Sequence, residues 1–219
     1  MTGFFTFTVF PKKLHLCSLI KIIMSAKAAA TRLNILQKAF GLVYQNGYRT
    51  TSVDEIIATT QVTKGAFFYH FKNKDEMGLA MINEVMVPGM QGALIGPLSD
   101  SDDPVNEIYA MMHSLLMENP FFIVKYGCPA VNLVEEMASH NEAFQSSLMK
   151  LNNQWHEAIS TCLEKGKTSG KIKKDTNSKQ VAYFIMAGYG GIRNLGKIYG
   201  KEIYKGHLEQ LKIYLKTLI

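Results

Sequence analysis

The chain has 219 residues, of which 47% are hydrophobic, and it carries a net charge of +6. This length leaves room for one large domain or for a small and a medium one, and the apolar fraction is ordinary for a globular protein with a core. Three scattered cysteines are too few for a disulfide framework or a zinc site. We therefore expect no metal, no cofactor and a reducing, cytoplasmic location.

The first 24 residues differ from the rest of the chain. They hold two apolar runs on either side of Pro11, and three lysines without an acidic residue. The second run is too short for a membrane span and is interrupted by Lys21, although its flanks loosely resemble those of a signal peptide. We favour an upstream extension with Met24 as a candidate start, and an appended arm that belongs to the protein stays open.

From residue 26 onward the chain reads as consecutive helices, because apolar residues recur at helical spacing and no alternating strand pattern occurs. Gly47 is expected to cap the first helix, and Ser52 with Glu55 to form a capping box at the start of the second. Pro88–Gly89 should stop the fourth helix, and residues 92–104 should form a loop. We predict an all-α fold of about nine helices, at 27–46, from 51, from 63, 73–87, 105–118, 129–139, 142–167, 180–199 and 205–218.

Residues 51–74 are the most informative stretch, because two helices of about eight residues joined by a tight turn form a helix-turn-helix. Val62 supplies the apolar residue of the turn, and Phe67 and Phe71 form the inward face of the second helix. Lys64 and Phe68 share an outward face whose narrow start can enter the major groove of DNA. Residues 25–80 hold seven basic and four acidic residues, which suits phosphate binding, although a merely solvated surface would look the same.

The chemistry of this outward face assigns roles to its residues. Lys64 can donate to guanine O6 and N7, and the N–H groups at the start of its helix can hold a phosphate. Tyr69, His70 and Lys74 suit phosphate contacts, which set register without reading sequence. For His70, capping of helix carbonyls is an equal alternative. The expected DNA-binding residues are Thr51, Ser52, Thr63, Lys64, Gly65, Ala66, Tyr69, His70 and Lys74.

A family resemblance is carried by residues 31–80, which read TRLNILQKAFGLVYQNGYRTTSVDEIIATTQVTKGAFFYHFKNKDEMGLA. This segment resembles the DNA-binding domain of the tetracycline-repressor-like (TetR) family. The resemblance implies a transcriptional regulator, expected to be a repressor, with an extension at 1–24, a DNA-binding domain at 25–73 and a ligand-binding and dimerisation domain at 74–219. Many members carry tyrosine where this chain has Phe68, so we expect Tyr69 or His70 to make that phosphate contact.

The region from about residue 90 to the end resembles the family only in size and helical rhythm, and its ligand is not readable. Ligand pockets are mostly apolar with a few placed polar groups, although methionines and aromatic residues at helical spacing are more often core. The candidate effector-binding residues are His113, Phe122, Tyr126, Cys128, Trp155, Tyr183, Tyr189 and Arg193.

Cys128 precedes Pro129 and is therefore expected to cap a helix, where a thiol becomes more reactive. The segment GCPAVNLVEEMA is also similar to a branch of the family that carries a Gly-Cys pair at this point, and some of those members sense electrophiles. An electrophile or oxidant is therefore one class of inducer to consider. The alternative is a small buried residue at a helix start.

Residues 180–218 are expected to form the homodimer interface. Four glycines would let helices approach closely, and a stripe of apolar residues would meet the partner: Gly188, Gly190, Gly191, Gly196, Ile203, Leu208, Leu211, Tyr214, Leu215 and Leu218. A dimer would bind a palindromic double-stranded operator, and a small-molecule inducer would release it. The alternative for these helices is that they only close the core of the body.

Motifs that resemble those of enzymes are incomplete in this sequence. Residues 166–168 resemble the end of a phosphate-binding loop, but threonine stands at position 161 where that motif requires glycine. We therefore expect no enzyme, and no membrane partner. The serious alternative is a DNA-binding protein without a ligand, either architectural or controlled by a partner protein, and such a protein would have a filled body.

Overall fold

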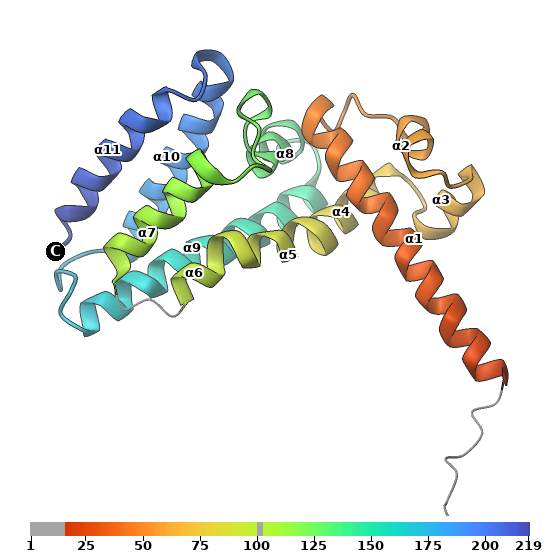
Figure 1. The fold of residues 1–219 in the computed structure, drawn as a ribbon, viewed down its shortest axis with the longest axis horizontal. Coiled ribbons are helices and arrows are strands. Elements are labelled where there is room, and N and C mark those ends of the chain that lie inside the picture. Colours follow the sequence, from red (N-terminus) through yellow and green to blue (C-terminus); the bar gives the residue numbers. More distant parts are fainter. Residues whose placement is uncertain (1–15, 100–102) are drawn as a thin grey trace, which may run out of the picture.

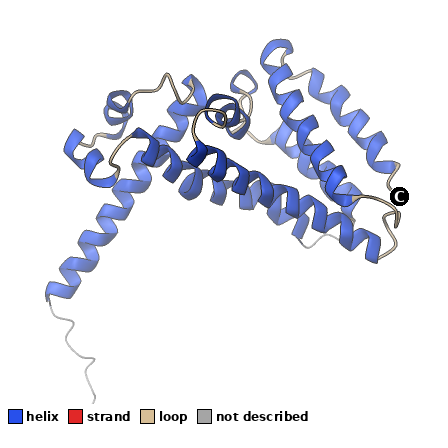
Figure 2. Cartoon of the chain, turned by 180° about the vertical axis from the view of Figure 1, so that it is seen from behind, coloured by secondary structure: helices blue, strands red, loops and turns tan. Residues whose placement is uncertain are grey.

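The computed structural model describes residues 16–99 and 103–219, with side chains from residue 24 onward, as helices joined by short loops (Figure 2). The head consists of α1 (Leu16–Asn46), α2 (Val53–Thr60) and α3 (Lys64–His70). The remaining elements are α4 (Lys74–Met81), η1 (Ile82–Met86), α5 (Val87–Met90), η2 (Gln91–Ile95), α6 (Gly96–Ser99), α7 (Pro104–His113), η3 (Ser114–Glu118), η4 (Val124–Tyr126), α8 (Pro129–Met137), α9 (Glu142–Thr168), α10 (Ser178–Tyr199) and α11 (Ile203–Lys216). These described residues contain no strand, so the all-α prediction is confirmed.

Local signals placed the end of α1 and the starts of α2 and α3 correctly. Gly47 adopts a left-handed conformation with φ of +91°, and Ser52 and Glu55 form the expected capping box. The Thr63 hydroxyl accepts a hydrogen bond from the Ala66 N–H at 3.1 Å, which starts α3 where it was predicted. Such caps satisfy backbone groups that the helix itself leaves unpaired.

Helix α1 begins earlier than expected. The prediction placed its start near residue 27, whereas the helix is continuous from Leu16 through the candidate start Met24. Figure 1 shows this end extending away from the head. Among the described residues, no helix is long and apolar enough to cross a bilayer.

The prediction that Pro88–Gly89 ends the fourth helix is wrong, as is most of the predicted loop at 92–104. The elements α4 to α6 form one continuous rod that ends at Ser99 (Figure 1). The π-helical turn η1 lies directly before Val87 and Pro88, and a second, η2, follows α5. A proline clashes with the carbonyl four residues earlier in a regular α-helix, and the wider π turn relieves that clash.

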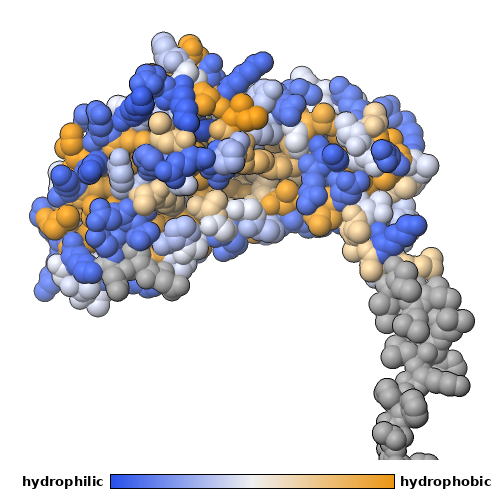
Figure 3. All heavy atoms as spheres, viewed as in Figure 1, coloured by the Kyte–Doolittle hydropathy of each residue, from blue (hydrophilic) through white to orange (hydrophobic). Residues whose placement is uncertain are grey.

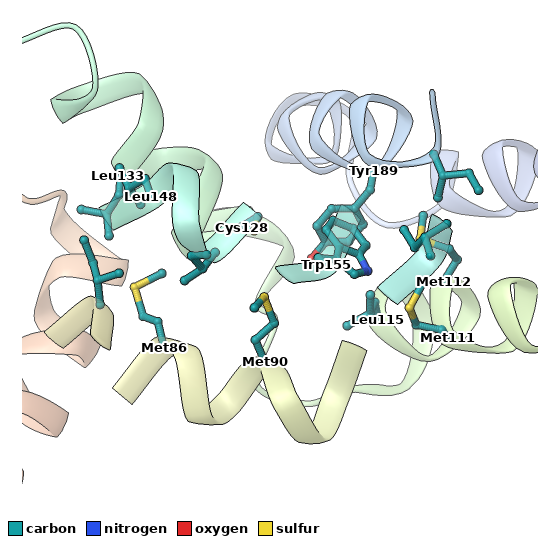
Figure 4. Packing of buried hydrophobic residues seen from close by; sticks show 14 of the residues in the cluster. Met86, Met90, Met111, Met112, Leu115, Cys128, Leu133, Leu148, Trp155 and Tyr189 are labelled. Atoms are coloured by element: carbon teal, nitrogen blue, oxygen red, sulfur yellow. The ribbon is translucent and has the colours of Figure 1, made fainter. Parts of the chain in front are cut away.

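The body packs the rod, α7, α8 and α10 against the long helix α9, and α11 packs on α7 and α10. One continuous core joins head and body. Figure 4 shows Met86 pointing from the rod toward Leu148 and Cys128, and Met90 pointing between Cys128 and Trp155. The space-filling view shows that this face of the body is hollowed in the middle, with an apolar floor (Figure 3).

The apolar stripe predicted on the last helix does not face outward. Leu208, Leu211, Leu215 and Leu218 are buried within the chain itself. Two of the four glycines behave in the same way, because Gly188 lies against the His207 ring of α11 and Gly196 lies against Tyr204. These residues close the core of the body, which corrects that part of the interface prediction.

Candidate DNA-binding and effector sites

The recognition helix α3 has the two faces that a helix-turn-helix requires. Phe67 and Phe71 are buried in the head, whereas Tyr69 is 78% exposed and Phe68 is also exposed. Val62 packs against the core from the turn between α2 and α3. The helix is therefore held by its aromatic inner face and presents the other face to a partner.

Lys64 stands at the start of that outer face. Its Nζ lies 3.1 Å from Asp54 Oδ1 of α2, and both side chains are exposed. Surface ion pairs of this kind contribute little free energy, so Lys64 can exchange Asp54 for another acceptor. A β-carbon at Gly65 would meet only the Thr63 hydroxyl oxygen, at 3.9 Å, so the surface there is open to close approach.

Thr51 is not placed as expected for a DNA contact. It is 1% exposed, and its hydroxyl donates to the Gly47 carbonyl at 2.7 Å. A buried and satisfied hydroxyl does not reach a phosphate, so we leave Thr51 out of the proposed interface. The neighbouring Ser52 is exposed, and its hydroxyl oxygen accepts from the Glu55 N–H at 3.1 Å.

His70 and Lys74 lie at the edge of the outer face, and both are half-buried. The His70 carbonyl accepts from Arg32 Nη1 at 2.9 Å, and burial together with the Arg32 charge lowers the pKa of its ring. Lys74 Nζ lies 4.6 Å from the centre of the Tyr48 ring and donates to the Arg49 carbonyl at 3.3 Å. Burial lowers the pKa of Lys74. Both residues therefore also hold the head together.

Several predicted effector residues do come together inside the body. Cys128 occupies the N-cap of α8, as expected, and is buried. The Trp155 ring packs edge-on against the Tyr189 ring, with centroids 5.3 Å apart. Burial raises the pKa of Tyr189, and the nearby Cys128 adds to the effect while Arg193 opposes it. Phe122 lies over the Arg193 guanidinium at 5.2 Å, and the Tyr126 ring packs edge-on against Tyr44.

Two predicted effector residues lie elsewhere. Tyr183 is 61% exposed on α10 and packs on His156, with ring centroids 4.1 Å apart. His113 Nδ1 lies 3.2 Å from Glu118 Oε1, in a pair that is open to solvent. Both residues lie on helices of the body, as the sequence predicted, but neither contacts Cys128, Trp155 or Tyr189.

Sequence reasoning missed Arg32, which ties the head to the rod. Its guanidinium binds both carboxylate oxygens of Glu84, at 2.7 and 3.1 Å, and its Cζ lies 4.4 Å from the Phe71 ring centre. The pKa of Arg32 is raised, mainly through the hydrogen bond to Glu84. Arg32 therefore joins α1, the end of α3 and η1, although its charge alone gave no hint of these partners.

Two family profiles match the chain on either side of this junction. One describes bacterial regulatory proteins of the tetR family and matches residues 35–81. The other describes the tetracyclin repressor-like C-terminal domain and matches residues 103–210. The chain belongs to the TetR family of transcriptional regulators. The family and its curated members are regulators and not enzymes.

Curated TetR-family relatives share modest identity with the chain. An HTH-type transcriptional regulator in the lacX 3′ region of Lactococcus lactis subsp. lactis is 32% identical over 121 residues, which is 55% of this chain and 62% of that relative. The repressor DhaR of Mycobacterium sp. is 23% identical over 160 residues, 73% of this chain and 79% of its own. The chain thus spans a little under two thirds of the first of these relatives.

Solved TetR-family structures share the fold. A regulator from Chloroflexus aurantiacus superposes with a TM-score of 0.78 at 23% identity, covering 88% of this chain and 98% of its own. The reduced form of Escherichia coli NemR gives a TM-score of 0.73 at 23% identity, covering 86% and 97%. Together with the all-helical order, these likenesses confirm an N-terminal helix-turn-helix domain followed by a helical C-terminal domain.

The head and body of this TetR-family chain also meet at the end of α8. The Glu136 carboxylate accepts hydrogen bonds from the backbone N–H groups of Tyr48 and Arg49, at 3.2 and 3.0 Å. On the opposite side, the Tyr48 hydroxyl donates to Asp75 Oδ1 at 2.8 Å. The turn between α1 and α2 is therefore bound by α8 and by α4 together.

Glu136→Ala should loosen this junction. Because it removes two hydrogen bonds to a charged acceptor, we expect the free energy of unfolding to fall by about 1–3 kcal/mol in urea titrations. Hydrogen exchange at the Tyr48 and Arg49 amides should accelerate. The control is Glu135→Ala, because the Glu135 carboxylate binds Asn194 of α10 and not the head. Equal exchange rates in both variants would show that Glu136 does not hold the turn.

Proposed function

We propose that the chain is a dimeric repressor that binds a palindromic operator and leaves it when a small molecule binds the body. The observation that carries this proposal is the recognition helix, whose inner face is buried while Lys64, Phe68 and Tyr69 stand outward. One short helix supplies too little specific affinity, but two heads about one DNA turn apart read two half-sites. Such a protein would act where the DNA is, in the cytoplasm.

The proposed dimer interface lies within residues 180–218, on a face that differs from the predicted stripe. Large apolar side chains are exposed along α10 and on α11: Tyr183, Phe184, Leu195, Ile198, Tyr199 and Ile213. Contiguous exposed apolar surface marks an interaction site. Gly191, with no atom within 4 Å of its β-carbon position, would let a partner helix approach this face closely.

We further propose that Lys64, with Ser52, Thr63, Gly65, Ala66, Tyr69, His70 and Lys74, forms the DNA interface. Lys64→Ala should lower the free energy of binding to the operator by about 1–3 kcal/mol and reduce discrimination against scrambled DNA, because it removes a contact to base edges. Lys74→Ala should weaken both DNAs about equally, since phosphate contacts carry no sequence information. Fluorescence anisotropy with both DNAs measures the two effects, and Lys150→Ala on α9 is the charge-matched control. Unchanged discrimination in Lys64→Ala would remove Lys64 from base readout.

We propose that the body holds the inducer. Because of Cys128, electrophiles and oxidants are one chemical class of inducer to test. Cys128 is 7% exposed, so only a small reagent would reach it. Release of operator by an oxidant in the native chain but not in Cys128→Ser would support this class.

A second candidate function has its own support. Trp155, Met111 and Met112 are all packed into the core, as expected for a DNA-binding protein whose body holds no small molecule. A partner protein would then control it. A screen in which no small molecule shifts the thermal unfolding midpoint, while a second protein releases operator, would favour this reading.

A further inference from the structure

Arg193 is a buried cation whose charge is not neutralised. The residue is 0% exposed, and its Nη2 donates to the Gly127 carbonyl, while Nε and Nη1 have no hydrogen-bond partner. Within the part of the chain that the structure describes, no carboxylate lies at ion-pair distance from it. Burying a charge without a counter-charge is strongly unfavourable, and proteins pair such groups or use them to bind a ligand.

Two other buried side chains of the body can donate hydrogen bonds. The Trp155 Nε1–H is buried and lacks a partner, and the buried Tyr204 hydroxyl interacts with the Arg193 guanidinium. Tyr204 lies against the guanidinium, with its ring centre 5.7 Å from Arg193 Cζ. Trp155 packs on Tyr189, which stands one helical turn before Arg193 on α10. A buried guanidinium with two nitrogens free to donate is complementary to a ligand that offers hydrogen-bond acceptors.

The surroundings of these donors are apolar. Met86 points from the rod toward Cys128, Met90 lies between Cys128 and Trp155 (Figure 4), and Phe122 covers the guanidinium. An open groove between the end of α1 and α8 is lined by Tyr44, Tyr126 and Lys197, and also by Glu135 and Glu136. We propose that Arg193 binds the carboxylate of a small organic acid whose apolar part lies among these methionines and aromatic rings. This inference rests on the proposed function, because it names the chemical class of the effector.

The site has a direct connection to the head. The Gly127 carbonyl accepts from Arg193 of α10 and also from the Tyr44 hydroxyl of α1, at 2.8 Å. A carboxylate that binds the free Nε and Nη1 of Arg193 would act on the same guanidinium whose Nη2 holds this carbonyl at the start of α8. The far end of α8 carries Glu136, which binds the turn between α1 and α2. Binding at Arg193 therefore changes the forces on a helix that contacts the head at both ends.

Trp155, the single tryptophan of the chain, reports on binding without DNA. The probes are acetate, butyrate, hexanoate and benzoate, each compared with its primary amide, and inorganic phosphate. We expect a saturable change of Trp155 fluorescence with the larger acids and none with the amides. Arg193→Met should weaken acid binding by roughly thirtyfold or more. It should not lower the thermal unfolding midpoint, because it removes an unpaired buried charge, whereas Arg49→Met is the control that leaves binding unchanged.

Three outcomes would overturn the inference: no acid changes the fluorescence, the amides bind as well as the acids, or Arg193→Met still binds the acids. A response to inorganic phosphate equal to that of hexanoate and benzoate would overturn the organic-acid assignment. Operator release is measured separately by adding the acid to the protein–DNA complex. Binding without release would leave the carboxylate site standing and contradict the inducer role, whereas absent binding with intact operator affinity would contradict only this inference.

Discussion

Ile198→Glu is expected to convert the protein to a monomer and to abolish specific operator binding. Ile198 is 75% exposed on α10, beside the exposed Leu195 and Tyr199. In a two-fold interface the substitution places a carboxylate from each subunit in an apolar contact. Desolvating these charges should cost about 3 kcal/mol or more, which weakens dimerisation more than about a hundredfold.

The matched control for that variant is Met149→Glu. Met149 is an exposed apolar residue of α9, outside the proposed interface. Light scattering after gel filtration gives the mass of each variant, and anisotropy gives its operator affinity. We expect Ile198→Glu to be a monomer without specific operator binding, and Met149→Glu to be a dimer with full operator affinity. The reverse pattern would place the interface on α9.

Gly78→Ala is expected to destabilise the fold and weaken operator binding, although alanine is the better helix former. A β-carbon on Gly78 of α4 would lie 2.7 Å from Phe144 Cζ and 2.7 Å from Tyr48 Cε2. Both rings are buried and cannot move aside freely. Overpacking of this kind costs about 1–3 kcal/mol, whereas the gain in helix propensity is about 1 kcal/mol. Because two rings are displaced, we expect the free energy of unfolding to fall by about 2 kcal/mol.

Gly41→Ala provides the comparison, because Gly41 lies within α1 and its β-carbon position has no atom within 4 Å. The free energy of unfolding of that variant should rise by about 0.5–1 kcal/mol. Thermal melting of both variants separates packing from propensity, with Gly78→Ala falling by about 4–8 °C and Gly41→Ala rising. If Gly78→Ala melted as high as Gly41→Ala, the head and body would not be packed through this contact.

The sequence predicted the features that depend on neighbours along the chain. The capping box at Ser52 and Glu55, the Thr63 cap and the two faces of α3 follow from residues a few positions apart. The rod through Pro88 was missed because its helical state is held by packing of Met86 and Met90 onto the body. A local rule for proline does not include that contribution.

Periodicity also showed which face of α11 is apolar but not what covers it. Leu208 and Leu211 are covered by the chain's own helices, while Ile213 is exposed. The candidate effector site shows the same limit. The sequence identified Arg193 as a candidate polar residue of the body. It could not show that two of its nitrogens lack a hydrogen-bond partner, because the surroundings of Arg193 are formed by residues such as Tyr44 and Gly127, which lie 83 residues apart and meet only in the fold.

The most direct test of the central claim is titration of the purified protein against labelled DNA from the flanks of its own gene. The titration is run at physiological salt with excess competitor DNA, because non-specific binding depends steeply on salt. We expect a saturable complex at one dimer per site, with a footprint over a palindrome. Weak binding that is lost with salt and indifferent to sequence, at that DNA and at fragments covering the rest of the genome, would contradict it.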